Sequence, residues 1–478
     1  MERKSGVLLS VSSLWGEHSC GSFGTAAIEF IDFLERGGFS YWQVLPFGLV
    51  DECNSPYKSY STFGGNPYFV DVERLYNSGL VTTEEYNGAK QKTPYSCEYD
   101  RLRQERVALL IKASTRADEE LKSKISDFIS ENKHICDFCK FMALKEANDN
   151  KEWTEWKVTE YSADTEYGWQ FIQYEFFTQW QTIKEYANSK GVKIIGDIPI
   201  YVSFDSSDVY FNKSLFMMDD NNRLTDVAGV PPDYFAEDGQ LWGNPLYDWD
   251  AMEKEDYRWW KDRIKSALTL FDGVRIDHFR AFESFWAVPG DAKTAKNGKW
   301  IKGPGMKLIN AIKSVADDKL IIAEDLGDIT EEVIALVEES GFPGMRVFQF
   351  GFLGGETPHK PHNYINNCIA YSGTHDNNTL LGYLWETPMD IKNDIMRYCA
   401  CDPLDWNEKG CDAIIRTIMG SNAGLCIFPV QDLLGYGKDT RLNVPGRAED
   451  NWQYRLTKEQ MNLINAEKYK YLNNLYGR

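Results

Sequence analysis

The sequence contains 478 residues, 43% of them hydrophobic and 26% charged, as in an ordinary globular protein. Because 72 acidic residues outnumber 52 basic ones, the net charge is −20, which repels nucleic-acid phosphates and anionic lipid surfaces. No stretch approaches the roughly 18 apolar residues that cross a bilayer. We therefore expect no nucleic-acid partner and no membrane partner, whereas a neutral substrate is compatible with this charge.

Residues 4–11 at the N-terminus resemble either a short signal peptide or a first strand. The sequence WGEH at 15–18 stands where the small residues of a cleavage site should be, so we interpret the segment as a strand. The ten cysteines are scattered, and Cys136 and Cys139 form a C-x-x-C pair without a second such pair. Their neighbours have helical spacing, which favours buried helix cysteines over zinc or redox chemistry. We expect reduced thiols, no metal site and a cytoplasmic location.

Short apolar segments alternate along the chain with segments of helical pattern. We predict helices over 26–35, 181–190, 260–271, 306–316 and 331–339. Strands are predicted over 6–10, 41–46, 193–199, 273–277, 320–325, 345–350, 368–372 and 424–430. Eight buried parallel strands with interleaved helices indicate an α/β fold, a (β/α)8 TIM barrel. A doubly wound open sheet is the alternative, but no G-x-G-x-x-G follows the first strand.

Two long segments interrupt this alternation. The segment 51–182, after the second strand, is too long for a loop, and its 99–147 portion has helical Leu/Ile/Ala spacing. The segment 203–257, after the third strand, is rich in Asp, Asn, Gly and Pro. We expect residues 1–478 to form a single catalytic barrel, with 51–182 as a mostly helical inserted subdomain and 203–257 as a second insertion. Both leave from C-terminal strand ends, where barrel active sites are built.

Acidic residues stand at the ends of several predicted strands, with few basic residues to neutralise them. These residues are Asp197, Asp277, Glu324, Asp325 and Asp376. Such a cluster suits either a divalent cation or the cleavage of a glycosidic bond, which needs one ionised and one protonated carboxyl group.

Local sequence separates these two chemistries. Strand alternation places Arg275 on the same face as Asp277, where its guanidinium favours an ionised carboxylate and repels a metal ion. Glu324 follows the apolar residues 321–323, so it is a candidate for a raised pKa and for the role of acid. We therefore favour glycosidase-type chemistry.

Aromatic residues accompany the acidic ones in the loops after the second and third strands. Flat rings among Asn, Gly and Pro offer stacking faces for a sugar, although each ring alone is equally typical of a loop anchored in the core. The rings are Tyr57, Tyr60, Tyr234, Phe235 and Trp242.

Seven motifs in order give the sequence a clear resemblance to a known family. They are Asn54-Ser55-Pro56-Tyr57, Gly64-Gly65-Asn66-Pro67, Gly229-Val230-Pro231-Pro232-Asp233-Tyr234-Phe235, Gln240-Leu241-Trp242-Gly243-Asn244-Pro245, Arg275-Ile276-Asp277-His278, Ala323-Glu324-Asp325-Leu326-Gly327 and Gly373-Thr374-His375-Asp376-Asn377. Together they resemble the 4-α-glucanotransferases, or amylomaltases, of the α-amylase clan. The resemblance runs from residue 41 to residue 452.

This resemblance implies roles for individual residues. Asp277 corresponds to the nucleophile, Glu324 to the general acid and then base, and Asp376 to the carboxylate that holds the sugar hydroxyls. It further implies sugar-binding or positioning roles for Tyr57, Ser55, Asp197, Trp242, Asn244, Arg275, His375 and Asn443. The loop 229–244, which carries Trp242, resembles an acceptor-side lid.

The resemblance also implies the reaction. We expect transfer of 4-α-glucan segments between maltooligosaccharides, or to glucose, by a retaining double displacement that needs no cofactor. We expect no C-terminal β-domain, unlike ordinary α-amylases. An α-glucan hydrolase that uses the same carboxylates is the alternative, followed by a non-catalytic glucan-binding protein.

Overall fold

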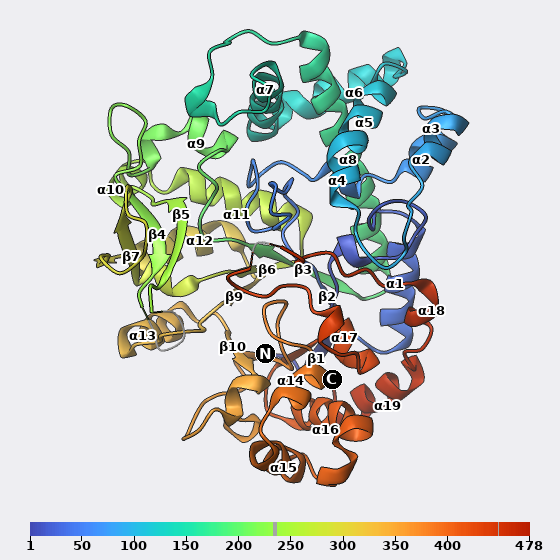
Figure 1. Cartoon of the computed structure of the whole chain (residues 1–478), viewed down its shortest axis with the longest axis vertical. Helices are drawn as coiled ribbons and strands as arrows, with labels where there is room; N and C mark the ends of the chain where they lie inside the picture. The colour runs from blue at the N-terminus through green and yellow to red at the C-terminus, as the bar shows by residue number, and fades with distance from the viewer. Residues whose placement is uncertain (233–236, 448) are drawn as a thin grey trace.

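The computed structural model describes residues 1–232, 237–447 and 449–478, and its centre is a closed barrel of parallel strands (Figure 1). The strand order is β1-β12-β11-β10-β9-β6-β3-β2, and β1 closes the ring by pairing with both β2 and β12. The strands are β1 (Lys4–Leu8), β2 (Tyr41–Gln43), β3 (Lys193–Ile198), β6 (Gly273–Ile276), β9 (Leu320–Ala323), β10 (Gly344–Val347), β11 (Cys368–Tyr371) and β12 (Leu425–Pro429). The (β/α)8 barrel predicted from the sequence is confirmed, with a strand at each expected place.

The barrel strands are short and apolar because both of their faces are covered. All residues of β6, β11 and β12 are buried, as expected for parallel strands between a barrel interior and surrounding helices. Close packing also explains Gly196 in β3, since a Cβ there would lie 2.1 Å from the ring of Phe271. The surrounding helices include α1 (Thr25–Arg36), α11 (Arg258–Leu270), α12 (Met306–Ala316), α13 (Glu331–Ser340), α14 (Leu380–Glu386), α15 (Met389–Tyr398) and α16 (Trp406–Gly420).

The chain between β2 and β3 forms most of the helices at one end of the molecule (Figure 1). They are α2 (Val72–Asn77), α3 (Thr83–Gly88), α4 (Tyr99–Arg101), η3 (Leu102–Arg106), α5 (Val107–Ser114), α6 (Glu119–Glu131), α7 (Lys133–Ala147) and α8 (Ala163–Ser189). Position 182, the expected end of the first insertion, lies inside α8, which begins well before the predicted residue 181. Cys136 and Cys139 lie on α7, and no group of three potential metal ligands is found within the described residues.

A second sheet, which the sequence analysis did not predict, lies beside the barrel. It is antiparallel, in the order β5-β4-β7-β8, with β4 (Asp226–Val230), β5 (Gln240–Pro245), β7 (Ser284–Pro289) and β8 (Lys299–Lys302). Two of its strands come from the 203–257 segment, which also holds α9 (Ser207–Phe211) and α10 (Trp249–Lys254), and the other two follow β6. This sheet therefore ties the second insertion to the segment that follows barrel strand β6.

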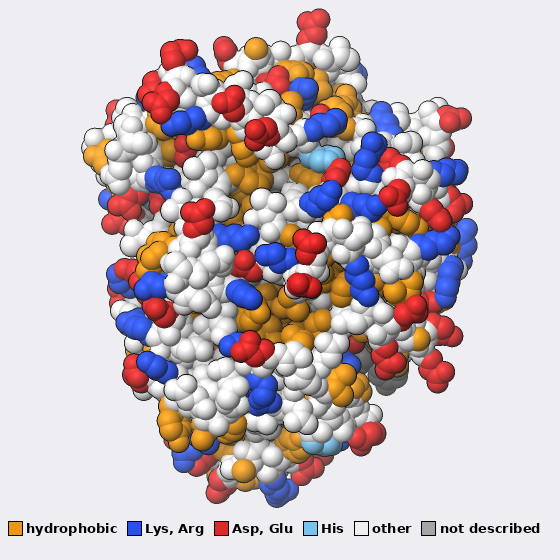
Figure 2. Space-filling model, turned by 180° about the vertical axis from the view of Figure 1, so that it is seen from behind, with side chains coloured by type: hydrophobic (Ala, Val, Ile, Leu, Met, Phe, Trp, Pro, Cys, Tyr) orange, Lys and Arg blue, Asp and Glu red, His pale blue; other side chains and the backbone are white. Residues whose placement is uncertain are grey.

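After β12 the described chain forms only short helices and turns. The elements are α17 (Val430–Leu434), η10 (Lys438–Thr440), α18 (Lys458–Met461) and α19 (Ala466–Tyr476), so no further strand follows within the described residues. Among the described helices, none combines the length and the apolar character needed to cross a membrane. On the face in Figure 2, acidic and basic side chains are interspersed rather than separated into patches.

Candidate active site

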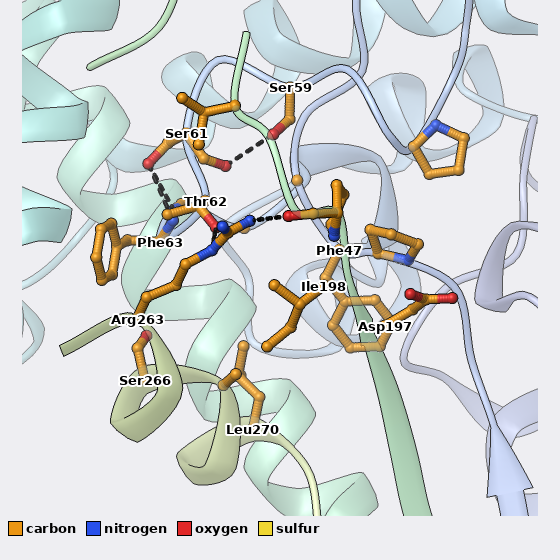
Figure 3. Close-up of a pocket in the computed structure, with 18 of the residues that line it drawn as sticks. Phe47, Ser59, Ser61, Thr62, Phe63, Asp197, Ile198, Arg263, Ser266 and Leu270 are labelled. Atoms are coloured by element: carbon orange, nitrogen blue, oxygen red, sulfur yellow. Dashed lines mark hydrogen bonds between the residues drawn. The ribbon is translucent and has the colours of Figure 1, made fainter. Parts of the chain in front are cut away.

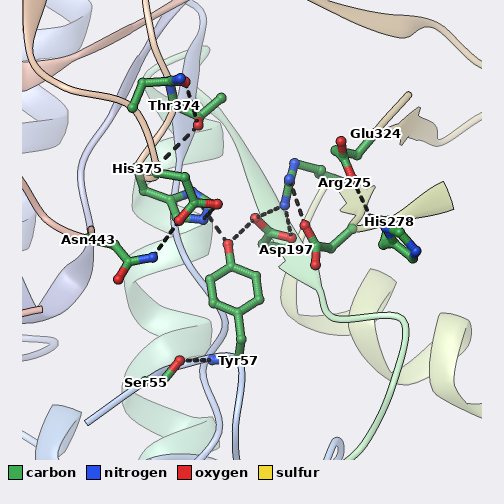
Figure 4. Close-up of polar contacts among 12 residues, drawn as sticks. Ser55, Tyr57, Asp197, Arg275, His278, Glu324, Thr374, His375 and Asn443 are labelled. Carbon is green, nitrogen blue, oxygen red and sulfur yellow. Dashed lines mark hydrogen bonds and ion pairs between the residues drawn. The ribbon is translucent and has the colours of Figure 1, made fainter. Parts of the chain in front are cut away.

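Side chains from six strand ends or loops meet at the carboxyl end of the barrel (Figure 4). β3 supplies Asp197, β6 supplies Arg275 and, one residue beyond its end, Asp277, and Glu324 directly follows β9. The loops after β2, β11 and β12 supply Tyr57, His375 with Asp376, and Asn443. The structure thus brings the three predicted catalytic carboxylates to one rim.

Arg275 joins two of the carboxylates. Its Nη1 donates to both carboxylate oxygens of Asp197 at 2.8 Å, and its Nη2 donates to Oδ1 of Asp277 at 2.7 Å. Although burial lowers the pKa of the guanidinium, the charges of Asp197 and Asp277 raise it well above its ordinary value. Arg275 is therefore a permanent cation that fixes Asp277 at the mouth of the barrel.

Asp197 lies beneath Arg275 rather than in the open cleft. Its side chain is 0% exposed, and burial raises its pKa against the opposing charge of Arg275. The hydroxyl of Tyr57 donates to its Oδ2 at 2.8 Å. Tyr57 also stacks on His375, with ring centroids 5.0 Å apart and planes inclined by 20°. Asp197 thus supports both the ion pair and an aromatic wall.

Glu324 has the environment of a carboxylic acid that retains its proton. Burial, and next the charge of Asp277, raise its pKa to about 8, although Arg275 and two hydrogen bonds oppose the shift. The bonds come from the backbone N–H groups of His278, at 2.6 Å, and Leu326, at 2.9 Å. His278 adopts a left-handed backbone conformation, φ 52°, directly after Asp277. The same turn therefore follows the strand that carries Asp277 and orients Glu324.

Asp376 is held in the opposite protonation state. Desolvation raises its pKa, but the charge and hydrogen bond of His375, whose Nε2 lies 3.2 Å from Oδ2, hold it well below its usual range. Asn443 Nδ2 donates to its Oδ1 at 2.6 Å. The charge of Asp376 in turn raises the pKa of His375, although burial of the imidazole lowers it. A barrel rim with Asp376 ionised and Glu324 protonated has both forms that glycosidic cleavage requires.

Two residues of this site were missed by the sequence analysis. Arg441 donates from Nη2 to the carbonyl of Asp376 at 2.5 Å and from Nε to the carbonyl of Asn443 at 2.7 Å. Trp452 is buried, with its ring centroid 5.9 Å from that of Tyr57 and 5.8 Å from that of His375. Both lie in the chain after β12, where no regular hydrophobic period shows which side chains face the site. Only the family resemblance, through Asn443 and the end of the match at residue 452, pointed to this part of the chain.

The other predicted sugar-binding residues lie around this centre. Trp242, on β5, meets the ring of His278 edge-on at 4.9 Å, and burial lowers the pKa of that imidazole to about 4. Asn244 Nδ2 donates to the carbonyl of Val202 at 2.9 Å. Ser55 Oγ accepts the backbone N–H of Tyr57 at 3.3 Å.

Some of the predicted neighbours do not join the centre. Asp325 was expected at the same rim, but it turns toward β10, where it accepts from Arg346 Nη1 at 2.9 Å and from the backbone N–H of Met345 at 2.6 Å. The ring of Tyr60 has Lys145 Nζ over it, 4.9 Å from its centroid, which is typical of a loop anchor. Tyr234 and Phe235 lie outside the described residues.

Comparison with known proteins agrees with the chemistry of this rim. A family model described as 4-α-glucanotransferase matches residues 9–461, nearly the whole chain. The chain belongs to this 4-α-glucanotransferase family. The resemblance found in the sequence is therefore confirmed.

Similar proteins cover the chain from end to end. A 4-α-glucanotransferase of Clostridium butyricum is 42% identical over 98% of this chain and 100% of its own. One from Thermus thermophilus is 40% identical over 95% of both chains. The solved amylomaltase of Streptococcus agalactiae, in complex with acarbose, has a TM-score of 0.95 at 37% identity and covers 100% of both chains. The family assignment thus rests on both sequence and structure.

Proposed function

We propose that this 4-α-glucanotransferase moves 4-α-glucan segments between maltooligosaccharides, or onto glucose, by a retaining double displacement. The observation that carries the proposal is the pair of differing carboxyl groups: Asp277, bonded to the Arg275 cation, and Glu324, with a pKa raised to about 8. A retaining enzyme needs a carboxylate nucleophile on one side of the glycosidic bond and a protonated carboxyl group on the other.

In the first step, Glu324 gives its proton to the glycosidic oxygen while Asp277 attacks the anomeric carbon. The bond between that carbon and the leaving oxygen breaks, and a covalent glycosyl ester forms on Asp277. Positive charge develops on the sugar ring, and the ionised Asp376 lies where it can bind ring hydroxyls and stabilise this charge. Tyr57 supplies the adjacent stacking face.

In the second step, Glu324, now ionised, takes a proton from an incoming hydroxyl group. If that hydroxyl is the 4-hydroxyl of another glucan, the segment is transferred; if it belongs to water, the segment is hydrolysed. Trp242, beside His278, is the proposed acceptor-side ring, which would hold a sugar over the intermediate and exclude water. The segments 51–182 and 203–257 are proposed to act as the two insertions that border this cleft.

The net charge, a related structure and the free cysteines support the proposed substrates and location. Neutral α-1,4-glucans are compatible with a net charge of −20, which disfavours nucleic acid. The acarbose complex of the Streptococcus agalactiae amylomaltase supports a glucan-shaped site. The cysteines are free thiols, which supports a reducing, cytoplasmic location.

Incubation with maltotriose alone tests the proposed activity. Transfer produces glucose together with chains longer than three sugars, which chromatography resolves as a ladder. A product mixture that contains only glucose and maltose would assign the protein to the hydrolases. Binding of maltotriose without any turnover would favour the glucan-binding alternative.

Trp242→Ala is expected to shift products from transfer toward hydrolysis. Loss of one stacking ring costs on the order of 1 kcal/mol of acceptor binding, so the transfer-to-hydrolysis ratio should fall about fivefold. Trp385→Ala is the matched control, because Trp385 is an exposed ring on α14 that contacts none of the site residues named above. The ratio of glucose released to chains lengthened reports the outcome. An unchanged ratio would contradict the acceptor role.

The raised pKa of Glu324 predicts an alkaline limit to activity. Glu324 acts as an acid only when protonated, so kcat/KM should be retained at pH 6–7 and lost as the pH rises through about 8. Initial rates with low maltotriose concentrations, measured from pH 5 to 10, report this limb. A profile that stays flat from pH 7 to 10 would contradict the assignment of Glu324 as the acid.

A further inference from the structure

Arg263, on α11, is a buried cation outside the rim described above. Arg263 is 2% exposed, and it forms no ion pair with any carboxylate in the described parts of the chain. Its guanidinium lies over the rings of Trp260, at 4.8 Å, and Trp259, at 5.5 Å. Burial lowers the pKa of Arg263, and the charge of the buried Asp208, which lies beyond ion-pair distance, opposes this shift only in part. The hydrogen bonds of the guanidinium must therefore be well formed.

Those hydrogen bonds hold the chain where it leaves barrel strand β3. Arg263 Nη1 donates to the carbonyl of Ile200 at 3.0 Å, and Nη2 donates to the carbonyl of Pro199. Its Nε donates to Thr62 Oγ1 at 2.7 Å, in the loop after β2 (Figure 3). Tyr247 gives Ile200 a second bond, at 2.7 Å. We call residues 197–200 the β3 exit segment.

The β3 exit segment also holds the nucleophile. The backbone N–H of Asp277 donates to the carbonyl of Ile198 at 2.9 Å. The side chain of Asp197 fixes Arg275, which in turn bonds Asp277. Two independent links therefore connect this four-residue segment to Asp277, one through the backbone and one through the ion pair.

A small cavity separates Arg263 from the rim. It has a volume of about 50 Å³, and Arg263, Thr62, Pro199, Asp197 and Tyr57 are among its lining residues (Figure 3). Because this cavity borders the β3 exit segment, packing alone does not prevent that segment from moving. The hydrogen bonds that Arg263 donates to the carbonyls of Pro199 and Ile200 restrain this segment where packing does not.

We propose that Arg263 is a positioning residue for the proposed transfer reaction: by binding the carbonyls of Pro199 and Ile200, it fixes the β3 exit segment and thereby the placement of Asp277. Arg263 touches no reacting atom and acts through Asp197, Ile198 and Arg275. This inference rests on the proposed function.

Arg263→Met tests this role, since methionine keeps an unbranched apolar stem over Trp260 but donates no hydrogen bond. Placement errors of about 1 Å cost up to about 100-fold in rate, so we expect kcat for maltotriose to fall about 30-fold with KM changed less than twofold. Arg263→Lys retains one donor group and should recover part of the loss, to about fivefold below wild type. Rates are normalised to the folded fraction measured by circular dichroism.

Arg106→Met is the matched control. Arg106 is equally buried, at 3% exposed, and likewise bonds backbone carbonyls, those of Tyr68 at 3.0 Å and Val70 at 3.2 Å, but it has no link to β3. Its variant should unfold at a lower temperature with kcat unchanged. A purely structural Arg263 would behave in the same way, and kcat of folded Arg263→Met within twofold of wild type would overturn the inference.

An activated donor locates the step that is affected. α-Maltosyl fluoride needs no proton on its leaving group, so a loss that arises at Asp277 persists with this donor. We expect the 30-fold loss to remain, whereas its disappearance would place the effect on Glu324 and overturn the inference. If Arg263→Met does not fold, Arg263→Lys and Arg106→Lys decide by the same comparison. Wild-type protein that leaves maltotriose unchanged would contradict the proposed function instead.

Discussion

Asp277→Asn is expected to abolish both transfer and hydrolysis of maltotriose, with kcat reduced about 10⁴-fold or more. Asparagine has nearly the same shape and can still accept from Arg275 Nη2, which donates to Asp277 at 2.7 Å. Its amide oxygen, however, does not form a stable ester with the anomeric carbon. The loss is therefore chemical rather than structural, and glucose release from maltotriose measures it.

Asp325→Asn provides a matched control for this result. Asp325 follows Glu324 at the same rim but turns away to Arg346 and the backbone of Met345. Its substitution should lower the unfolding temperature and leave kcat within about threefold of wild type. Substantial turnover by Asp277→Asn, or an equal loss in both variants, would contradict the role of Asp277.

Glu324→Gln is the second substitution with a large expected effect. General acid–base catalysis contributes about 10²–10⁴-fold, so kcat for maltotriose should fall by about 10³-fold. The first step should be largely restored with α-maltosyl fluoride, because fluoride leaves without a proton. The burst of fluoride ion in rapid mixing reports this first step separately from the second.

The control for Glu324 is another buried glutamate. Glu175, on α8, is also buried with a raised pKa, and it accepts from Gln179 Nε2 at 3.0 Å outside the active site. Glu175→Gln should retain its rate with both donors. If the fluoride burst of Glu324→Gln with α-maltosyl fluoride is slowed as much as its turnover of maltotriose, Glu324 acts in some way other than as the acid.

The barrel was predictable because each of its strands has a local signal. A strand buried on both faces is a short apolar run, and a helix with a stop at Gly37, Gly191 or Gly341 precedes the next one. The β5-β4-β7-β8 sheet lacked such a signal. Its strands contain Gly, Asn and Lys, and β4 pairs with β7, which lies far along the chain, through register that no local pattern specifies.

The candidate active site likewise contains residues that the sequence predicted and residues that it did not. Asp197, Arg275, Asp277 and Glu324 were predictable because each stands at the end of a recognisable strand, where the barrel fold determines the position. Asp325 was misplaced, because the residue after a strand end can turn to either side, and its pairing with Arg346 decides which. The contributions of Arg441 and Trp452 come from irregular chain, so they depend on tertiary packing that a sequence pattern does not specify.

The most direct test of the account is to identify the atom that carries the sugar during the reaction. Glu324→Gln treated with α-maltosyl fluoride should accumulate the intermediate, since the second step then lacks its base. Peptide mass spectrometry at low pH should find a maltosyl group on Asp277. Label on a different residue, or steady turnover of the fluoride with no label on any peptide, would contradict the double displacement at Asp277.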